Sequence, residues 1–182
     1  MERVRQGDTD AFAQLVEAHQ HRVIGAVAKM LGDATDAEDI AQQVFVRVWR
    51  SAPRYEPTAK FTTWLFTIMR NLVCNELRRR KRHPARSLDA PLDDSEQPLQ
   101  IRDPGAKTPE ETLLDAELQD AILKAIAQLP EVHRMAIILR RYEDVSYEEI
   151  GEILGISVPA VKSVLFRART QLREMLRRYL ES

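Results

Sequence analysis

Apolar residues recur at helical spacing along nearly the whole chain, and no stretch alternates apolar and polar residues as a half-exposed strand would. The first apolar run covers residues 12–31, and we expect Thr9 or Asp10 to be the N-cap of this helix. Gly32 marks its end, because glycine readily takes the left-handed conformation that closes a helix. The pattern predicts an all-α fold.

Two further helices complete the N-terminal part of the chain. One opens at Thr35-Asp36 and stops before Pro53, and the next runs from about Thr63 to Arg82. The following His-Pro pair breaks the pattern, because the residue before a proline avoids the helical conformation.

Residues 84–109 contain five prolines, many acidic residues and no apolar period, which is typical of a linker. Helical spacing resumes at Pro109 and restarts at Pro130. The sequence therefore predicts two small helical modules, residues 1–83 and 110–182, joined by a flexible acidic tether.

The most specific local pattern is a helix-turn-helix that begins at Ser146. Ser146 and Glu149 have the spacing of a capping box. Gly155 suits the left-handed residue that ends the first helix, and Ser157 suits the N-cap of the second. Gly151 is expected to let the second helix cross closely. Such motifs place their second helix in the major groove of DNA.

The second helix of this motif has two distinct faces. One arc is apolar: Val161, Val164, Leu165, Ala168, Leu172 and Met175. The other arc holds Lys162, Ser163, Phe166, Arg167, Thr170 and Arg173. Phe166 either contacts a thymine methyl group or a sugar, or packs on a neighbouring helix. Six Lys or Arg against one acidic residue over 161–178 favour DNA as the partner of the polar arc.

The third N-terminal helix is apolar around most of its circumference, so we expect it to be largely buried. One narrow strip is polar: Thr67, Arg70, Asn71, Asn75 and Arg78, with Trp64 at its border. Amides beside an aromatic ring suit hydrogen bonding and stacking with unpaired bases, and the basic run that follows suits phosphates. The strip is equally compatible with an ordinary polar helix end.

The second N-terminal helix should expose a mixed face: Asp39, Gln42, Gln43, Val46 and Arg50. A valine on an otherwise polar surface indicates a protein partner.

The net charge of −1 conceals a strong segregation. Residues 1–86 have a net charge of +5, residues 87–120 have −8 and residues 121–182 have +2. Two basic blocks flank an acidic stretch, as in a nucleic-acid binder with an acidic tether, although solvated surface charge would give the same distribution.

Composition argues against several other classes of protein. The chain has 182 residues, six glycines and no glycine-rich loop, and this argues against a nucleotide-binding enzyme. No apolar run reaches the length of a membrane span, and the first residues lack a signal peptide, so a cytoplasmic location is expected. A metal or redox sensor would have to use His19, His21 and the single Cys74, which the helical spacing does not bring together. We expect no catalytic residue, cofactor or metal.

Three separated segments, in this order, resemble the sigma-70 family in its short extracytoplasmic-function (ECF) form. Residues 36–45 (DAEDIAQQVF) resemble the helix that docks on the RNA polymerase clamp. Residues 61–65 (FTTWL) followed by 70–72 (RNL) resemble the segment that melts and reads the −10 element. The stretch 146–169, which ends in FRAR, resembles the −35 reader. The resemblance covers nearly the whole chain.

This resemblance implies a sigma factor that binds core RNA polymerase and directs promoter-specific initiation. The residues implied at the −35 element are Arg140, Lys162, Ser163, Phe166 and Arg167. Those implied at the unpaired −10 strand are Trp64, Thr67, Asn71, Asn75 and Arg78, with the 54–63 loop helping to hold a flipped-out base. Those implied at the polymerase are Asp39, Gln42, Gln43, Val46 and Arg50. Gln43 stands where an acid is common in the family, and Gly151 replaces a usual alanine.

Family members are commonly held inactive by an anti-sigma factor, so such a partner is also implied. The linker of 26 residues would reach ~85 Å when extended, enough for promoter elements ~70 Å apart. Its acidity either mimics nucleic acid inside the polymerase or only keeps a tether soluble. The alternative function is a conventional helix-turn-helix regulator, which would bind duplex DNA by itself as a dimer.

Overall fold

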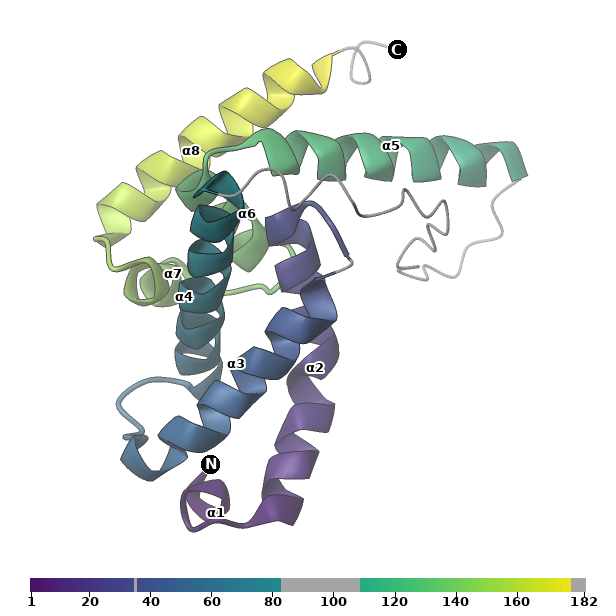
Figure 1. The fold of residues 1–182 in the computed structure, drawn as a ribbon. Helices are drawn as coiled ribbons and strands as arrows, with labels where there is room; N and C mark the ends of the chain where they lie inside the picture. The colour runs from purple at the N-terminus through teal and green to yellow at the C-terminus, as the bar shows by residue number, and fades with distance from the viewer. Residues whose placement is uncertain (35, 83–108, 178–182) are drawn as a thin grey trace.

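The computed structural model describes residues 1–34, 36–82 and 109–177, with side chains of the helix after the gap described from residue 117 onward. Within these ranges every regular element is helical. Figure 1 shows their arrangement. The N-terminal elements are α1 (Glu2–Arg5), α2 (Thr9–Leu31), α3 (Ala37–Ser51), the 3₁₀ turn η1 (Ala52–Arg54) and α4 (Phe61–Arg82). The C-terminal elements are α5 (Pro109–Gln128), α6 (Glu131–Arg141), α7 (Tyr147–Leu154) and α8 (Val158–Met175).

The expected all-α class is confirmed, and the helix limits differ from the predicted ones only locally. The N-cap of α2 is Asp8, whose carboxylate accepts a hydrogen bond from the backbone N–H of Ala11 at 2.8 Å, so the expectation of Thr9 or Asp10 was wrong. Gly32 closes this helix in the left-handed conformation, with φ of 69°, as predicted. The short α1 and η1 were not anticipated. The predicted linker lies outside the described residues except for Pro109, which begins α5.

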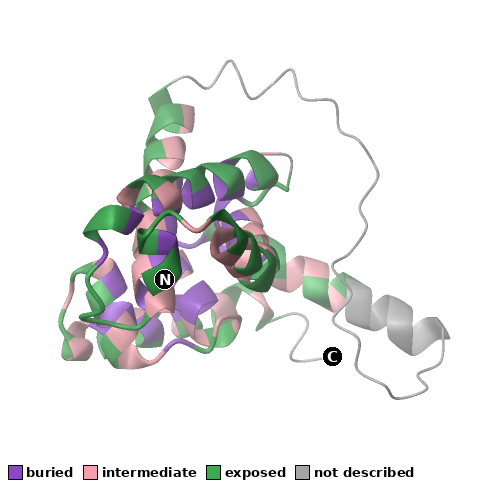
Figure 2. Ribbon diagram, turned by 90° about the horizontal axis from the view of Figure 1, so that it is seen from below, coloured by how far each residue is buried: buried purple, intermediate pink, exposed green. Residues whose placement is uncertain are grey.

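Helices α2, α3 and α4 pack against one another through their apolar sides. At the α2–α3 contact, the rings of Phe12 and Trp49 lie 4.9 Å apart. Helix α4 contributes Leu65, Phe66 and Met69, all with at most 1% of their surface exposed. Figure 2 shows buried residues on the inner sides of the helices and exposed ones outside.

The C-terminal helices pack against the N-terminal ones, which nothing in the sequence predicts. Helix α6 lies against α2, and α7 lies against α4 (Figure 1). Buried side chains from both halves of the chain form one hydrophobic cluster, which includes Met30 and Phe66 on one side and Ile138 and Ile150 on the other.

Arg134 of α6 fastens the two halves at the ends of α2 and α5. Its guanidinium donates hydrogen bonds to the carbonyl of Met30 at 2.5 Å, to that of Leu129 at 3.1 Å and to that of Ala127. Carbonyls in the last turn of a helix have no hydrogen-bond partner within the helix. The Arg134 guanidinium supplies donors to such carbonyls at the ends of both α2 and α5. Burial lowers the pKa of this guanidinium, although Glu131 opposes the effect.

No helix among the described residues combines the length and the apolar content needed to cross a membrane.

Replacing Arg134 with leucine should lower the free energy of unfolding by about 2 kcal/mol, because it leaves buried carbonyls at two helix ends without a donor. Denaturant unfolding of the full chain measures the loss. Arg141→Leu, an exposed arginine on the same helix, is the matched control and should change stability little. Equal losses in both variants would show that Arg134 does not fasten the helix ends.

Candidate nucleic-acid interface

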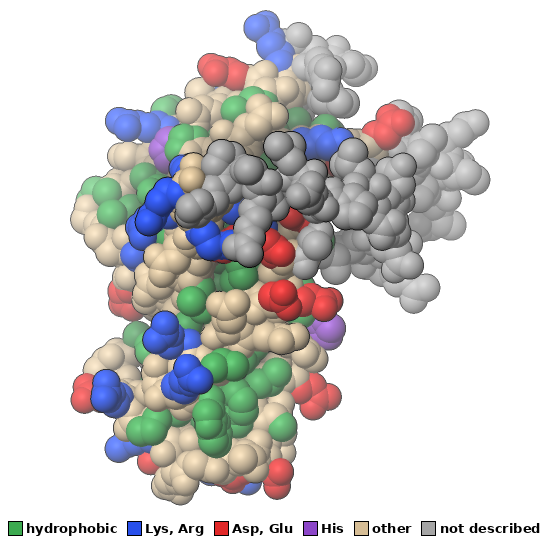
Figure 3. Space-filling view, viewed as in Figure 1, with side chains coloured by type: hydrophobic (Ala, Val, Ile, Leu, Met, Phe, Trp, Pro, Cys, Tyr) green, Lys and Arg blue, Asp and Glu red, His purple; other side chains and the backbone are tan. Residues whose placement is uncertain are grey.

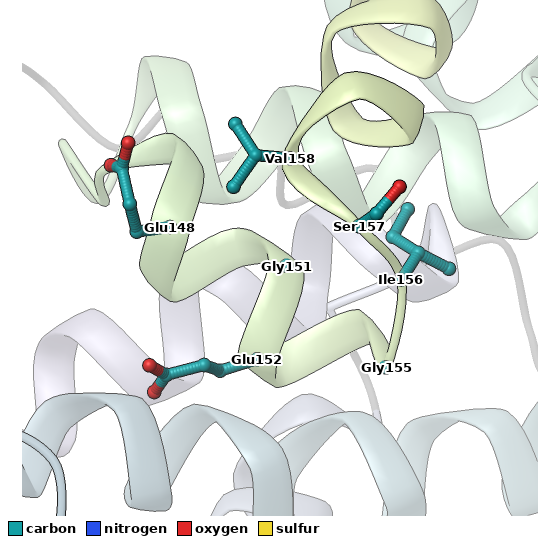
Figure 4. A pocket seen from close by; sticks show the side chains of 7 residues that line it. All are labelled: Glu148, Gly151, Glu152, Gly155, Ile156, Ser157 and Val158. Atoms are coloured by element: carbon teal, nitrogen blue, oxygen red, sulfur yellow. The ribbon is translucent and has the colours of Figure 1, made fainter.

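Helix α7 and the turn after it have the local geometry that the sequence predicts. The Ser146 hydroxyl accepts a hydrogen bond from the backbone N–H of Glu149 at 3.2 Å, and the Glu149 carboxylate accepts one from the N–H of Ser146 at 3.1 Å, which completes the capping box. Gly155 follows with φ of 69°, and Ser157 caps α8 by accepting from the N–H of Ala160 at 3.4 Å. Figure 4 shows this turn and the surrounding side chains.

Gly151 is required by the turn itself rather than by the crossing of α8. A Cβ atom at this position would lie 2.8 Å from the carbonyl oxygen of Ile156 and 3.8 Å from a methyl group of Val161. The N–H of Ile156 also donates to the carbonyl of Gly151 at 3.0 Å. The glycine therefore lets the turn fold back onto α7.

Helix α8 buries one face and presents the other to solvent. Val161, Leu165 and Ala168 are at most 1% exposed. The exposed side carries Lys162, Ser163, Phe166 and Arg167. The Phe166 side chain is 71% exposed, so the alternative that it packs on a neighbouring helix was wrong. Met175, which shares the apolar arc, is 39% exposed and therefore lies outside the buried face.

Arg140 lies at the end of α6, close to the start of the helix-turn-helix. Its guanidinium donates to the Asp144 carboxylate and to the carbonyl of Val145, each at 3.2 Å, and lies 5.6 Å from the centre of the Tyr147 ring. The side chain remains 39% exposed. These contacts hold a positive charge beside the first turn of α7.

The polar strip of α4 is exposed only over its C-terminal half. Asn71, Asn75 and Arg78 are exposed, and Arg78 donates to the side-chain oxygen of Asn75 at 3.1 Å. Trp64 and Thr67 are half-buried.

A cavity of about 150 Å³ lies at the N-terminal half of the strip, between the loop at residues 55–59, α4 and α7. Trp64 and Thr67 line it, together with Tyr55 of the loop and Glu152 of α7. The ring centres of Tyr55 and Trp64 are 4.9 Å apart, and the rings meet edge to face at an interplanar angle of 62°. The loop thus forms an aromatic-walled hollow beside the strip, of a size that accommodates a planar group.

Glu149 of α7 forms an ion pair with Lys60, which directly precedes α4. Burial alone would raise the pKa of its carboxyl, but hydrogen bonds from Ser146 and the ammonium of Lys60 outweigh burial and lower the pKa. The carboxylate is therefore held in its charged form, 3.1 Å from the Lys60 nitrogen.

Helix α3 presents a third surface. Its outward side exposes Asp39, Gln42, Gln43, Val46 and Arg50. Val46 is 49% exposed. Figure 3 shows hydrophobic and basic side chains gathered over the lower part of the molecule, where Figure 1 has α3 and η1. The mixed character of this surface suits a protein partner more than nucleic acid.

Within the described ranges, no three side chains of the metal-binding types gather closely enough to hold an ion. His19 instead faces the ring of Phe61, with ring centres 5.3 Å apart, and burial lowers its pKa. Cys74 is half-buried, which raises the pKa of its thiol and makes it less reactive.

Comparison with known proteins matches both halves of the chain. Residues 15–83 match the family model of Sigma-70 region 2, and residues 119–172 match that of Sigma-70, region 4. The chain is 36% identical to the ECF RNA polymerase sigma factor SigW of Bacillus subtilis, over 97% of this chain and 95% of that protein. It is 35% identical to the RNA polymerase sigma-H factor of Pseudomonas aeruginosa, over 97% and 91%.

The chain belongs to the sigma-70 family. The match over nearly its full length to SigW makes it a sigma factor of the ECF type, which directs RNA polymerase to promoters and starts transcription there. Its fold agrees: the structure of CnrH in complex with the cytosolic domain of CnrY superposes with a TM-score of 0.70 at 25% identity, over 96% of this chain and 93% of that one. The sigma factor RpoE from Bartonella quintana superposes with a TM-score of 0.69 at 24% identity, over 92% and 97%.

In this sigma factor the residues predicted for each partner fall on three separate surfaces. The residues predicted for −35 lie on α8 and the end of α6, those predicted for polymerase lie on α3, and those predicted for −10 lie on α4. Sequence reasoning included Lys60 only as part of the 54–63 loop, and it missed the covering of Trp64 and Thr67 by α7. Lys60 lies one residue before the FTTWL segment, and its charge beside that segment is the signal that would have drawn attention to it.

Proposed function

We propose that the three surfaces divide the work of initiation: α3 binds core RNA polymerase, α4 reads the unpaired −10 strand and α8 reads the duplex −35 element. The observation that carries this proposal is the separation of the surfaces, since each lies on a different helix and has a different chemistry. In this reading residues 1–83 and 110–182 are the two functional regions and residues 84–109 connect them.

The chemistry of α4 supports single-stranded DNA as its ligand. Asn71 and Asn75 present amides that can both donate and accept, which suits the edges of unpaired bases. The hollow beside Trp64 and Tyr55 has aromatic walls on which a flipped-out base can stack. Arg78 extends the strip toward a basic helix end that suits phosphates.

The chemistry of α8 supports duplex DNA. Lys162 and Arg167 are exposed donors on one face, and the exposed Phe166 lies between them as an apolar contact for a thymine methyl group. Arg140 supplies charge for a neighbouring phosphate. A repressor would use the same helix, but it would leave the α3 and α4 surfaces without a partner.

The protein acts without chemistry of its own in this proposal: it is a specificity factor that works in the cytoplasm beside RNA polymerase. Its structural relative RpoE from Bartonella quintana was solved in complex with the anti-sigma factor NepR. By analogy we propose that an anti-sigma factor also binds this chain.

Asn71→Ala should impair promoter melting while leaving core binding unchanged, because an exposed amide is removed from the −10 surface only. Permanganate reactivity of the promoter measures melting, and polymerase pull-down measures core binding. Glu17→Ala, an exposed change on α2, is the control. Equal loss of melting and of core binding would remove Asn71 from the −10 surface.

Arg167→Ala should weaken binding of the polymerase complex to a promoter by about 1–3 kcal/mol, with the loss confined to one −35 base pair, if this arginine reads a base. Binding to a set of promoters with single −35 substitutions measures it. A uniform loss across all sequences would make Arg167 a phosphate contact instead.

Asp39→Arg should reduce affinity for core polymerase, because it reverses a charge on the α3 surface. It should lower the denaturation midpoint only slightly, because the exposed side chain makes a weak interaction with the dipole at the first turn of α3. A competition assay with a labelled second sigma factor gives the affinity. Unaltered core affinity would place the polymerase contact elsewhere.

A further inference from the structure

Helix α1 is only four residues long, and polar contacts fix it to the start of α2. The Arg3 guanidinium pairs with the Asp8 carboxylate at 2.8 Å, and the backbone N–H of Asp8 donates to the carbonyl of Arg3 at 3.0 Å. Gly7 between them has a φ of 86°, which favours glycine, and its N–H donates to the carbonyl of Val4 at 3.0 Å. Asp8 is also the N-cap of α2, so one carboxylate holds α1 at the first turn of that helix.

Val4 is the residue of α1 that is buried. Its side chain is 2% exposed, whereas Glu2, Arg3 and Arg5 of the same helix are exposed. Helix α1 lies against α2 and η1, at the end of the N-terminal helices where α3 gives way to the loop before α4 (Figure 1). Ala52 of η1 is 1% exposed, and neither it nor Val4 belongs to the large hydrophobic cluster. Helix α1 and η1 therefore form a small packing unit outside that cluster.

The turn η1 leads directly into the aromatic-walled hollow. The backbone N–H of Tyr55 donates to the carbonyl of Ala52 at 3.0 Å, which joins the first residue of the loop to η1. The Tyr55 side chain is 9% exposed, and its ring meets the edge of the hollow that Trp64 forms. A shift of η1 therefore moves one wall of the hollow relative to the other.

The far end of the loop has a separate support. The ring centre of Phe61, the first residue of α4, lies 5.3 Å from that of His19 on α2 and 6.1 Å from that of Trp64. Residues 56–60, between the two supported ends, are exposed. The Tyr55 end thus depends on η1 and α1, whereas the Phe61 end depends on α2 and α4. Loosening α1 should change the hollow without disturbing the packing of α4.

We propose that Val4 is a positioning residue for −10 recognition: buried where α1 meets α2 and η1, it fixes η1 and so places the Tyr55 ring against which a flipped-out base stacks. The inference rests on the proposed role of the hollow beside Trp64. Val4 touches no DNA in this account and acts through Tyr55. The distance between the walls matters because a gap of less than an ångström already removes much of the attraction between stacked groups.

The first test measures the hollow in the full-length free chain. In a Trp49→Phe background, Trp64 is the sole tryptophan, and acrylamide quenching of its fluorescence reports its accessibility. Val4→Ala should raise the quenching constant about twofold, because a cavity under α1 loosens η1 and Tyr55. Val4→Ile, which keeps an apolar side chain, should stay near the wild-type value. Equal quenching in Val4→Ala and the wild-type chain would overturn the proposal.

The second test asks whether Val4 acts through the stacked base. The complex of the chain with core polymerase is bound to promoter DNA whose −10 element is already opened as a bubble, with an abasic site moved along the non-template strand. The position where the abasic site most weakens binding by the wild-type chain marks the stacked base. On the intact strand Val4→Ala should weaken binding about tenfold, and with the abasic site at that position it should cause no further loss.

Val27→Ala is the matched control, because it removes the same atoms from a buried valine of α2 within the large cluster. Any loss it causes should be equal on the intact and abasic strands, as expected for a residue that only stabilises the fold. If Val4→Ala does not fold, Val4→Thr keeps the shape of the side chain, buries a hydroxyl under α1 and is compared in the same way.

The outcomes separate this inference from the proposed function. Additive losses from Val4→Ala and the abasic site would overturn the positioning role of Val4 and leave the proposed role of the hollow intact. A wild-type chain whose binding is weakened at no abasic position would show that the hollow holds no base, and both the proposed role and this inference would fail.

Discussion

Between Phe61 and Leu77, helix α4 exposes only Asn71 and Asn75, and this constraint limits where the helix can meet a polar ligand. Its apolar sides are committed to α2 and α3, so only the strip from Trp64 to Arg78 remains for a polar ligand. Even this strip is shared, because α7 lies against its first half. One helix face therefore serves both as a packing surface within the chain and as the proposed −10 reader.

The three exposed surfaces differ in chemistry, as the tasks proposed for them would require. The α8 surface combines Lys162 and Arg167 with an exposed aromatic ring, which suits the major groove of a duplex. The exposed part of α4 presents amides, which suit unpaired bases. The α3 surface mixes charge with the exposed Val46, which suits a protein. A sigma factor needs all three, whereas a conventional regulator would need only the first, and the family match agrees with this difference.

Features set by neighbouring residues could be predicted from sequence. The capping box at Ser146, the left-handed Gly155 and the buried face of α8 depend on local backbone geometry and helical period. Contacts between distant residues could not, because no periodicity reports that Arg134 meets the end of α2 or that Glu143 meets Arg22. The N-cap of α2 was predicted wrongly because Asp8, Thr9 and Asp10 are all residue types that cap helices. The structure shows that Asp8 is the N-cap. Gly151 was expected to serve a helix crossing, but its closest neighbour is the backbone of the turn.

The most direct test of the central claim, that this chain gives core RNA polymerase its promoter specificity through two separate DNA-reading surfaces, is transcription of genomic fragments by bacterial core polymerase with and without the purified chain. The account predicts discrete start sites that appear only with the chain, each preceded by two sequence elements at a fixed spacing of about two helical turns. Absence of start sites, together with protection of duplex DNA by the chain alone, would contradict it.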